Sequence, residues 1–241
     1  MHYIPLAHIY TFYSAYRDSD FFGKLIFLGL FSISILCWCV LLHKAWVVKK
    51  VQKLREEFQK MVSQQKNSFL QFDLSKLPPG LHPFREIFNS IQQKTTEILR
   101  KNHFFAKDQG SYLSEADVEL IESHVLTTIS IQIKSLEKNL FLLTTITTLG
   151  PFLGLLGTVW GILVTFSGLQ AGASVTSNAA VLSGLSTALT TTVIGLLIAI
   201  PSLIGYNYLK NSIKTLSSDM EDFLYSSLSQ IELEYRRVNR G

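Results

Sequence analysis

The most informative absence in this sequence of 241 residues is charge. No Asp, Glu, Lys, Arg or His occurs in the 71 residues between Lys138 and Lys210. An ordinary soluble core does not contain such a run, whereas two membrane-spanning helices of about 20 residues each, joined by a short turn, account for it. A second uncharged run, at residues 25–42, also reaches spanning length. The sequence therefore predicts an all-α membrane protein with three transmembrane helices.

Cysteine and recognisable catalytic motifs are also scarce. The two cysteines, Cys37 and Cys39, lie in the first apolar run, and their spacing lacks the further Cys or His that a zinc site requires. No phosphate-binding loop, dinucleotide-binding turn or HExxH motif occurs, and no nucleophile signature stands out. We therefore expect a protein that is not an enzyme, has no catalytic residues and binds no metal and no cofactor.

The basic residues are distributed very unevenly. Twenty of the 22 Lys and Arg residues lie either between the first and second apolar runs or after the third. Because cytoplasmic loops carry the excess of Lys and Arg, we expect the N-terminus outside and the C-terminus in the cytoplasm. The net charge of +4 then reflects topology and requires no nucleic-acid partner. The predicted segments are 1–24 (periplasmic), 25–42 (transmembrane helix 1), 43–138 (cytoplasmic helical region), 139–168 (transmembrane helix 2), 169–178 (periplasmic turn), 179–209 (transmembrane helix 3) and 210–241 (cytoplasmic C-terminal helix).

Outside the predicted membrane segments, apolar residues recur at helical spacing. The first span is expected to continue as an amphipathic helix beyond residue 42. Ser114 is expected to cap a later helix, with Asp117 three residues on in a capping box. An apolar stripe from Val118 to Leu140 is expected to lead directly into the second span. These helical extensions predict a bundle outside the membrane.

Each of the last two spans carries a stripe of small residues. Such stripes let membrane helices approach closely, where van der Waals contact is the main attraction. We therefore expect a helix-packing role for both stripes, and packing alone explains much of their composition. Their members are Gly150, Gly154, Gly157 and Gly161 in the second span and Gly184, Ala188, Gly195 and Ala199 in the third.

Threonines accompany these stripes and allow two interpretations. A lone Thr in a span usually bonds to its own backbone, and Thr190, about 160° around the helix from Thr192, is expected to do so. Thr158, Thr187 and Thr192 are instead candidates for a polar lining that suits water or a proton pathway. A hydroxyl does not bind and release protons near neutral pH, so such a pathway needs a carboxylate from another chain.

Two segments carry a resemblance to a known family. The stretches "GPFLGLLGTVWGIL" (residues 150–163) and "ALTTTVIGLLIAIPSLIGYN" (residues 188–207) resemble the paired signatures of the TolQ/ExbB/MotA proton-channel family. The resemblance covers residues 140–210 and places the two pore threonines of the family on Thr158 and Thr192. Thr187 stands where these proteins usually carry a glutamate. Pro151 and Pro201 match the prolines of the two motifs, and we expect both to be helix-breaking.

The resemblance implies a motor subunit in the inner membrane of a Gram-negative bacterium. Such a subunit forms a homo-oligomer, a pentamer, around an ExbD/TolR-like single-span protein that supplies a membrane aspartate. Proton flow then drives a TonB/TolA-like protein that acts at the outer membrane. The alternatives are a non-conducting membrane scaffold of the same ring fold and a stand-alone small-solute channel. The sequence does not separate a Tol-like from a Ton-like role.

Overall fold

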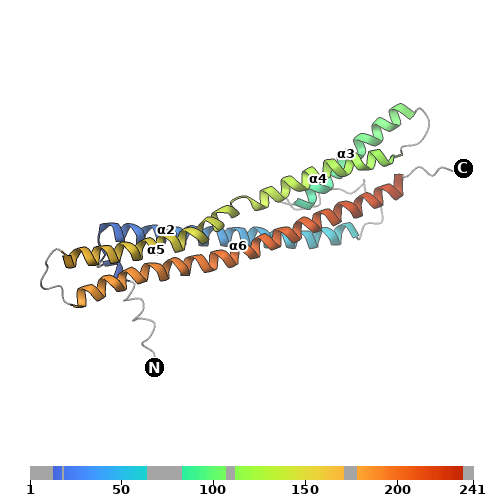
Figure 1. Cartoon of the computed structure of the whole chain (residues 1–241). Coiled ribbons are helices and arrows are strands. Elements are labelled where there is room, and N and C mark those ends of the chain that lie inside the picture. Colours follow the sequence, from blue (N-terminus) through green and yellow to red (C-terminus); the bar gives the residue numbers. More distant parts are fainter. Residues whose placement is uncertain (1–12, 18, 64–82, 107–111, 171–177, 236–241) are drawn as a thin grey trace, which may run out of the picture. The chain divides into compact units, whose positions relative to one another are not determined.

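The computed structural model describes residues 13–17, 19–63, 83–106, 112–170 and 178–235, nearly all of them helical. Five long helices follow one another in this part of the chain: α2 (Phe21–Ser63), α3 (Pro83–Ala106), α4 (Glu115–Glu137), α5 (Leu140–Gln170) and α6 (Asn178–Tyr235) (Figure 1). Three stretches, within Phe21–Phe58, Glu115–Gln170 and Gly184–Tyr235, are long and apolar enough to cross a membrane. The predicted all-α fold with three membrane-spanning helices is confirmed. The predicted N-terminal segment and the turn at 169–178 lie largely outside the described residues.

The chain folds into two compact units. The membrane unit comprises Met1–Lys44 and Asn139–Tyr208, and the charged unit comprises Ala45–Lys138 and Leu209–Gly241. Both α2 and α6 contribute one part of their length to each unit. The expected continuation of the first span as a helix is confirmed, because α2 runs without interruption to Ser63.

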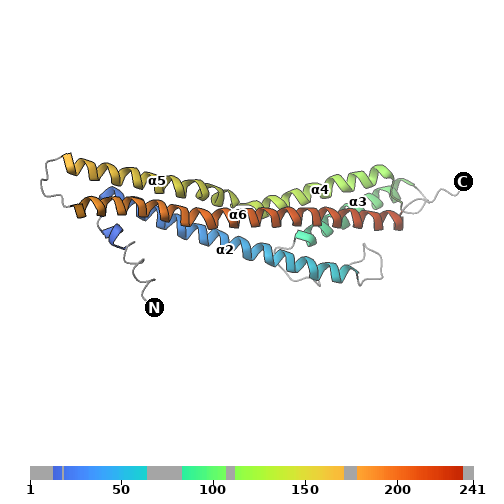
Figure 2. The same ribbon diagram turned by 60° about the horizontal axis from the view of Figure 1, so that its bottom comes forward.

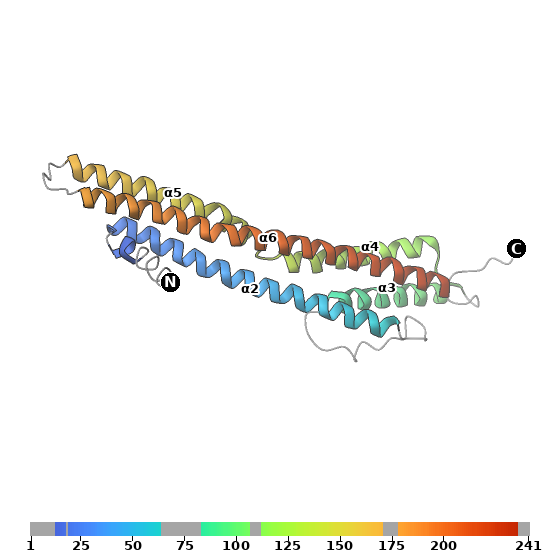
Figure 3. The ribbon, with the colours of Figure 1, turned by 90° about the horizontal axis from the view of Figure 1, so that it is seen from below.

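In the membrane unit, α5 and the first part of α6 form a helical hairpin. The two helices run side by side in every view, and α2 begins near the end at which α5 stops and α6 starts (Figures 2 and 3). On α2, the Leu41 side chain contacts Gly205 of α6. The described part of the unit thus contains three long helices whose outward-facing side chains are largely apolar.

The charged unit has a conventional aromatic core. Phe58 of α2 lies 6.0 Å from Phe88 of α3 and 5.4 Å from Phe223 of α6, measured between ring centroids. Phe84 completes this cluster at 6.0 Å from Phe223. Edge-to-face geometry at these distances is favourable for aromatic rings. The cluster joins α2, α3 and α6 within this unit.

The N-terminus of α4 has the predicted cap, but its C-terminus differs from expectation. Ser114 and Asp117 form the reciprocal capping box. The apolar stripe does not lead directly into the second span, because α4 ends at Glu137 and α5 begins at Leu140. Between them Asn139 has φ 69°, in the left-handed region that Asn tolerates better than most residues. The apolar side chains keep a regular helical spacing across this break, so the sequence pattern does not predict it.

The expectation that Pro151 and Pro201 break their helices is wrong. Both lie inside continuous helices, Pro151 in α5 and Pro201 in α6. A proline removes only one backbone donor, and helices in a membrane tolerate it when neighbouring helices support the chain on either side. Here Gly150, directly before Pro151, packs on Gly195 of α6.

Candidate functional site

The structure brings the two small-residue stripes into direct contact. A Cβ atom built on Gly154 would lie 2.9 Å from both the carbonyl oxygen of Thr191 and the Cα of Thr192. A Cβ on Gly150 would lie 2.9 Å from the carbonyl oxygen of Gly195. Since these neighbours are backbone atoms that cannot turn aside, α5 and α6 approach this closely only because glycine has no side chain.

The contact extends along most of both predicted stripes. A Cβ on Gly161 would lie 2.8 Å from that of Ala188, and Ala199 faces Gly150 at 3.7 Å. Gly157 packs against the Thr191 side chain, and Gly184 packs against the side chain of Thr165. Every residue proposed for helix packing therefore lies in the interface between α5 and α6.

Three threonine hydroxyls converge on one carbonyl group in this interface. The Oγ1 atoms of Thr158 and Thr192 are 2.8 Å apart, and each is 3.0 Å from the carbonyl oxygen of Gly154. Thr191 adds a third hydroxyl at 3.1 Å from the same oxygen and lies 2.7 Å from the carbonyl of Ala188. Because Gly154 has no side chain, its carbonyl is accessible to hydroxyls from both helices.

This threonine cluster has more acceptors than protons. Each hydroxyl donates one hydrogen bond, and a carbonyl oxygen accepts two. The Thr158 hydroxyl also lies 3.0 Å from a second acceptor, the carbonyl oxygen of Leu155. The three protons therefore have several alternative arrangements, which hydroxyl rotation interconverts. Such a cluster can orient a water molecule or an acid placed next to it.

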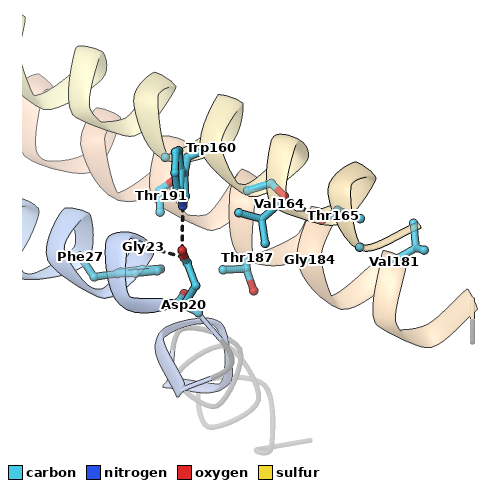
Figure 4. A pocket seen from close by; sticks show the side chains of 14 residues that line it. Asp20, Gly23, Phe27, Trp160, Val164, Thr165, Val181, Gly184, Thr187 and Thr191 are labelled. Atoms are coloured by element: carbon cyan, nitrogen blue, oxygen red, sulfur yellow. Dashed lines mark hydrogen bonds between the residues drawn. The ribbon is translucent and has the colours of Figure 1, made fainter. Parts of the chain in front are cut away.

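Thr187 and Thr190 do not join the cluster. Thr190 is buried and donates to the carbonyl of Ser186 at 2.8 Å, as the sequence predicts. Thr187, the position at which the resemblance implies a glutamate, is half-buried and lines a cavity of about 370 Å³ (Figure 4). Thr165 and Thr191 line the same cavity. The cavity therefore adjoins the threonine cluster through Thr191.

An acidic residue that sequence reasoning missed faces this cavity. Asp20, the residue before α2, accepts a hydrogen bond from the indole Nε1 of Trp160 at 2.9 Å (Figure 4). Its other oxygen accepts from the backbone N–H of Gly23 at 2.9 Å, which is the geometry of a helix N-cap. Partial burial raises the pKa of Asp20, but the bonds from Trp160, Gly23 and Phe22 outweigh it and hold the pKa below its usual value. An Asp directly before an apolar run is a helix-start signal, but nothing local in the sequence links it to Trp160.

The described residues contain no group of three or more His, Cys, Asp or Glu side chains placed to hold a metal ion. Within that same part of the chain, Cys37 and Cys39 are free thiols. The chemistry available at this site is thus that of hydroxyls, backbone carbonyls and one carboxylate.

Comparison with known proteins places this chain in a family. The model of the MotA/TolQ/ExbB proton channel family matches residues 86–222. The chain is 26% identical over 214 residues to the Tol-Pal system protein TolQ of Haemophilus influenzae, which covers 89% of this chain and 90% of that protein. It is 27% identical over 204 residues to TolQ of Pseudomonas aeruginosa, with 82% of each protein covered.

A similar relation holds to the biopolymer transport protein ExbB of Pseudomonas putida. The identity is 25% over 220 residues, which cover 91% of this chain and 63% of that protein. The family match spans more than half of the chain and includes α5 with the threonine-bearing part of α6. With its three apolar helices, this multi-pass membrane protein belongs to the MotA/TolQ/ExbB proton channel family.

Proposed function

We propose that this chain is the channel-forming subunit of a proton-driven motor in the inner membrane of a Gram-negative bacterium. The observation that carries this proposal is the pair of hydroxyls of Thr158 and Thr192, 2.8 Å apart between α5 and α6. Both residues are only half-buried, whereas Thr191 behind them is 2% exposed. A second chain can therefore reach the pair from outside the hairpin.

The cluster needs an acid to conduct protons. Threonine hydroxyls do not titrate near neutral pH, but they hydrogen-bond and orient a titrating group or a water molecule. The stretch from 139 to 209 contains no such group. We therefore propose an ExbD/TolR-like single-span partner whose membrane aspartate lies against Thr158 and Thr192 and carries the proton.

The outer surface of the hairpin suits assembly into a ring. Large apolar side chains are exposed on both helices, including Phe152 and Val159 on α5 and Val193 on α6. In a membrane such faces contact lipid or further copies of the chain. We propose a homo-oligomer, a pentamer, with the C-terminus in the cytoplasm, where the excess of Lys and Arg belongs.

The relatives suggest what the motor drives. Their names assign them to the Tol-Pal system and to biopolymer transport. By analogy, this subunit would pass the energy of proton flow to a TonB/TolA-like protein acting at the outer membrane. The analogy supports both a Tol-like and a Ton-like role.

Proton flux in liposomes tests the proposal. The subunit is purified with its single-span partner and reconstituted, and acidification of the interior is followed with a pH-sensitive dye. Thr158→Val and Thr192→Val should each abolish the flux while leaving the complex intact on size-exclusion chromatography. Thr190→Val is the matched control, because it removes a hydroxyl from α6 that donates within its own helix, to the carbonyl of Ser186.

Three outcomes would contradict the proposal, and two of them would favour another class of function. Full flux with either Val variant in the cluster would exclude the threonine pathway. Absence of flux in the wild-type complex would point to a scaffold. Robust conduction by the subunit alone, without a partner acid, would point to a solute channel.

A further inference from the structure

Asp20 is the only carboxylate among the described residues of the membrane unit. It lies outside the part of the chain that matches the family model, which begins at residue 86. Its position brings a titratable group from the start of α2 to the wall of a cavity otherwise lined by α5 and α6. Residues 139–209 contain no titratable carboxylate, and Asp20 supplies one from the same chain.

The carboxylate is held in a defined orientation by two donors. Its Oδ2 accepts from Trp160 and its Oδ1 accepts from Gly23, each at 2.9 Å. The indole ring of Trp160 also packs against Phe22, with 4.4 Å between ring centroids. The backbone N–H groups of Phe22 and of Asp20 itself also stabilise the ionised form, and the carboxylate lies in the wall of the cavity.

The cavity connects this carboxylate with the threonine cluster. Its volume of about 370 Å³ exceeds the share of roughly 30 Å³ that one water molecule occupies in the liquid several times over. The hydroxyl-bearing residues Thr165, Thr187 and Thr191 line it, and Figure 4 shows Thr187 and Asp20 in the wall of the same cavity. Thr191 in turn is 3.1 Å from the Gly154 carbonyl that binds Thr158 and Thr192. The cavity wall therefore holds both Asp20 and one member of the threonine cluster, Thr191.

We propose that Asp20 is the proton acceptor at the mouth of the pathway, and that the cavity beside Thr187 passes protons from it to the threonine cluster. The cavity lies toward the end of the hairpin at which α5 ends and α6 begins, since Gly168 and Val181 line it. In the proposed topology this is the periplasmic end, from which the proton motive force drives protons inward.

The proton step leaves the protein unchanged after each transfer. A hydronium ion outside the cavity transfers a proton to a carboxylate oxygen of Asp20 and becomes water. The resulting carboxylic acid gives the proton to a water molecule in the cavity, and the carboxylate is restored. The hydronium ion formed there passes its proton to the aspartate of the partner protein beside Thr192.

Among the described residues, Arg17 and Lys24 are the charged neighbours of Asp20 in the chain, and Asp18 lies outside the described residues. Lys24 follows one turn later in α2, and Arg17 precedes Asp20 in the chain. From α5 and α6 no charged residue faces it, because residues 139–209 contain none. The bond from Trp160 stabilises the ionised form, so its loss raises the pKa of Asp20.

The test compares three variants of the complete complex with its partner in liposomes. Asp20→Asn keeps a side chain that can cap α2 but cannot bind and release a proton. It should lower proton flux about tenfold or more, a loss within what a general acid–base group supplies, and remove the dependence of the flux on external pH. Asp20→Glu should retain most of the flux, because an acid is still present. Trp160→Phe should keep most of the flux but shift its pH midpoint upward.

Because this role rests on the proposed proton conduction, Thr192→Val is measured in the same preparations. If Thr192→Val abolishes the flux and Asp20→Asn leaves it unchanged, Asp20 is not the acceptor although the subunit conducts protons. If Thr192→Val has no effect, the proposed function itself fails. If Asp20→Asn, Asp20→Glu and Trp160→Phe all lower the flux equally and destabilise the complex, Asp20 is a structural clamp, and the proposed role is overturned.

Discussion

The two units of this protein use opposite kinds of side chain to hold helices together. In the membrane unit, α5 and α6 meet through glycine, alanine and threonine, with backbone against backbone. In the charged unit, α2, α3 and α6 meet through a cluster of buried phenylalanines. Water drives the burial of large apolar groups, whereas lipid is as apolar as those groups and gives no such drive.

Helix α6 shows the contrast within a single element. Its buried residues in the membrane unit are mostly small or hydroxylic, and those in the charged unit are mostly large and aliphatic. The first set includes Ala188, Thr190, Thr191, Ala199 and Ser202, and the second includes Leu209, Ile213, Leu216, Met220, Leu224 and Ile231. The close packing of small residues has a functional consequence, because it brings hydroxyls from two helices to one carbonyl.

The largest effect on stability is expected from removing one ring of the aromatic core. Phe88→Ala removes a fully buried ring and should destabilise the charged unit by about 3–5 kcal/mol. Phe104→Ala in the same helix is the control, because Phe104 is 78% exposed. Chemical denaturation in detergent, followed by circular dichroism, measures both. Equal destabilisation by the two variants would contradict the assignment of the core.

A smaller effect is expected from adding one methyl group to the contact between α5 and α6. Gly154→Ala places a Cβ 2.9 Å from backbone atoms of α6 and should cost about 1–3 kcal/mol as the helices separate. Gly29→Ala in α2 adds the same methyl group where no described atom beyond the adjacent backbone of α2 lies within 4 Å, so it should not destabilise the protein. Thermal unfolding in detergent compares the two variants. A harmless Gly154→Ala would mean that the membrane unit does not depend on close backbone contact.

Removing one buried hydroxyl should cost a similar, small amount of stability in each of the two units. In the membrane unit Ser202 donates to the carbonyl of Leu143 at 3.0 Å, and in the charged unit Ser90 lies 3.0 Å from the Thr128 hydroxyl. Ser202→Ala should cost about 0.6 kcal/mol, as hydrogen bonds between membrane helices do on average. Ser90→Ala should cost about 1 kcal/mol. Denaturation of both variants checks this, and a loss several times larger for Ser202 would show that lipid strengthens the bond.

The smallest effect on stability is expected at the surface of α3. Hydrogen bonds and charge from Lys101 and Lys94 lower the pKa of Glu97 to about 2. A lowered pKa means that the ionised form is favoured in the folded state, so this contribution is present above the usual pKa and is lost as the pH falls toward 2. Glu97 and Lys101 are exposed and solvent screens their charges, so Glu97→Gln should lower the unfolding temperature at pH 7 only slightly. Titration of the carboxyl by NMR should give a pKa below the ordinary 4.5, and a pKa at 4.5 would contradict the ion pairs.

Local patterns predict the membrane helices and the contact between α5 and α6 well. Missing charge identifies the spans because lipid excludes it, and the spacing of Gly154 and Gly195 places them on facing stripes of adjacent helices. The pairing of Asp20 with Trp160 could not be predicted, because 140 residues separate them and helix pairing across that distance leaves no local signal.

The helix break at Asn139 and the continuous helices at Pro151 and Pro201 depend on backbone geometry, which the spacing of side chains in the sequence does not predict. The helix break at Asn139 interrupts a regular apolar stripe, and its positive φ is invisible in that stripe. Taken alone, Pro151 and Pro201 predict helix breaks, because proline lacks a backbone N–H. Packing within the membrane unit keeps both helices continuous.

A double-mutant cycle of proton flux on Thr158 and Thr192 tests the central claim most directly. The flux of the complex with its single-span partner is measured for Thr158→Ser, Thr192→Ser, both single Val variants and the double Val variant. If the two hydroxyls act as a unit at 2.8 Å, the Ser variants conduct and the double Val variant is no worse than the more severe single one. Losses that multiply independently, or a double Val variant that conducts like the wild type, would contradict a shared proton pathway between α5 and α6.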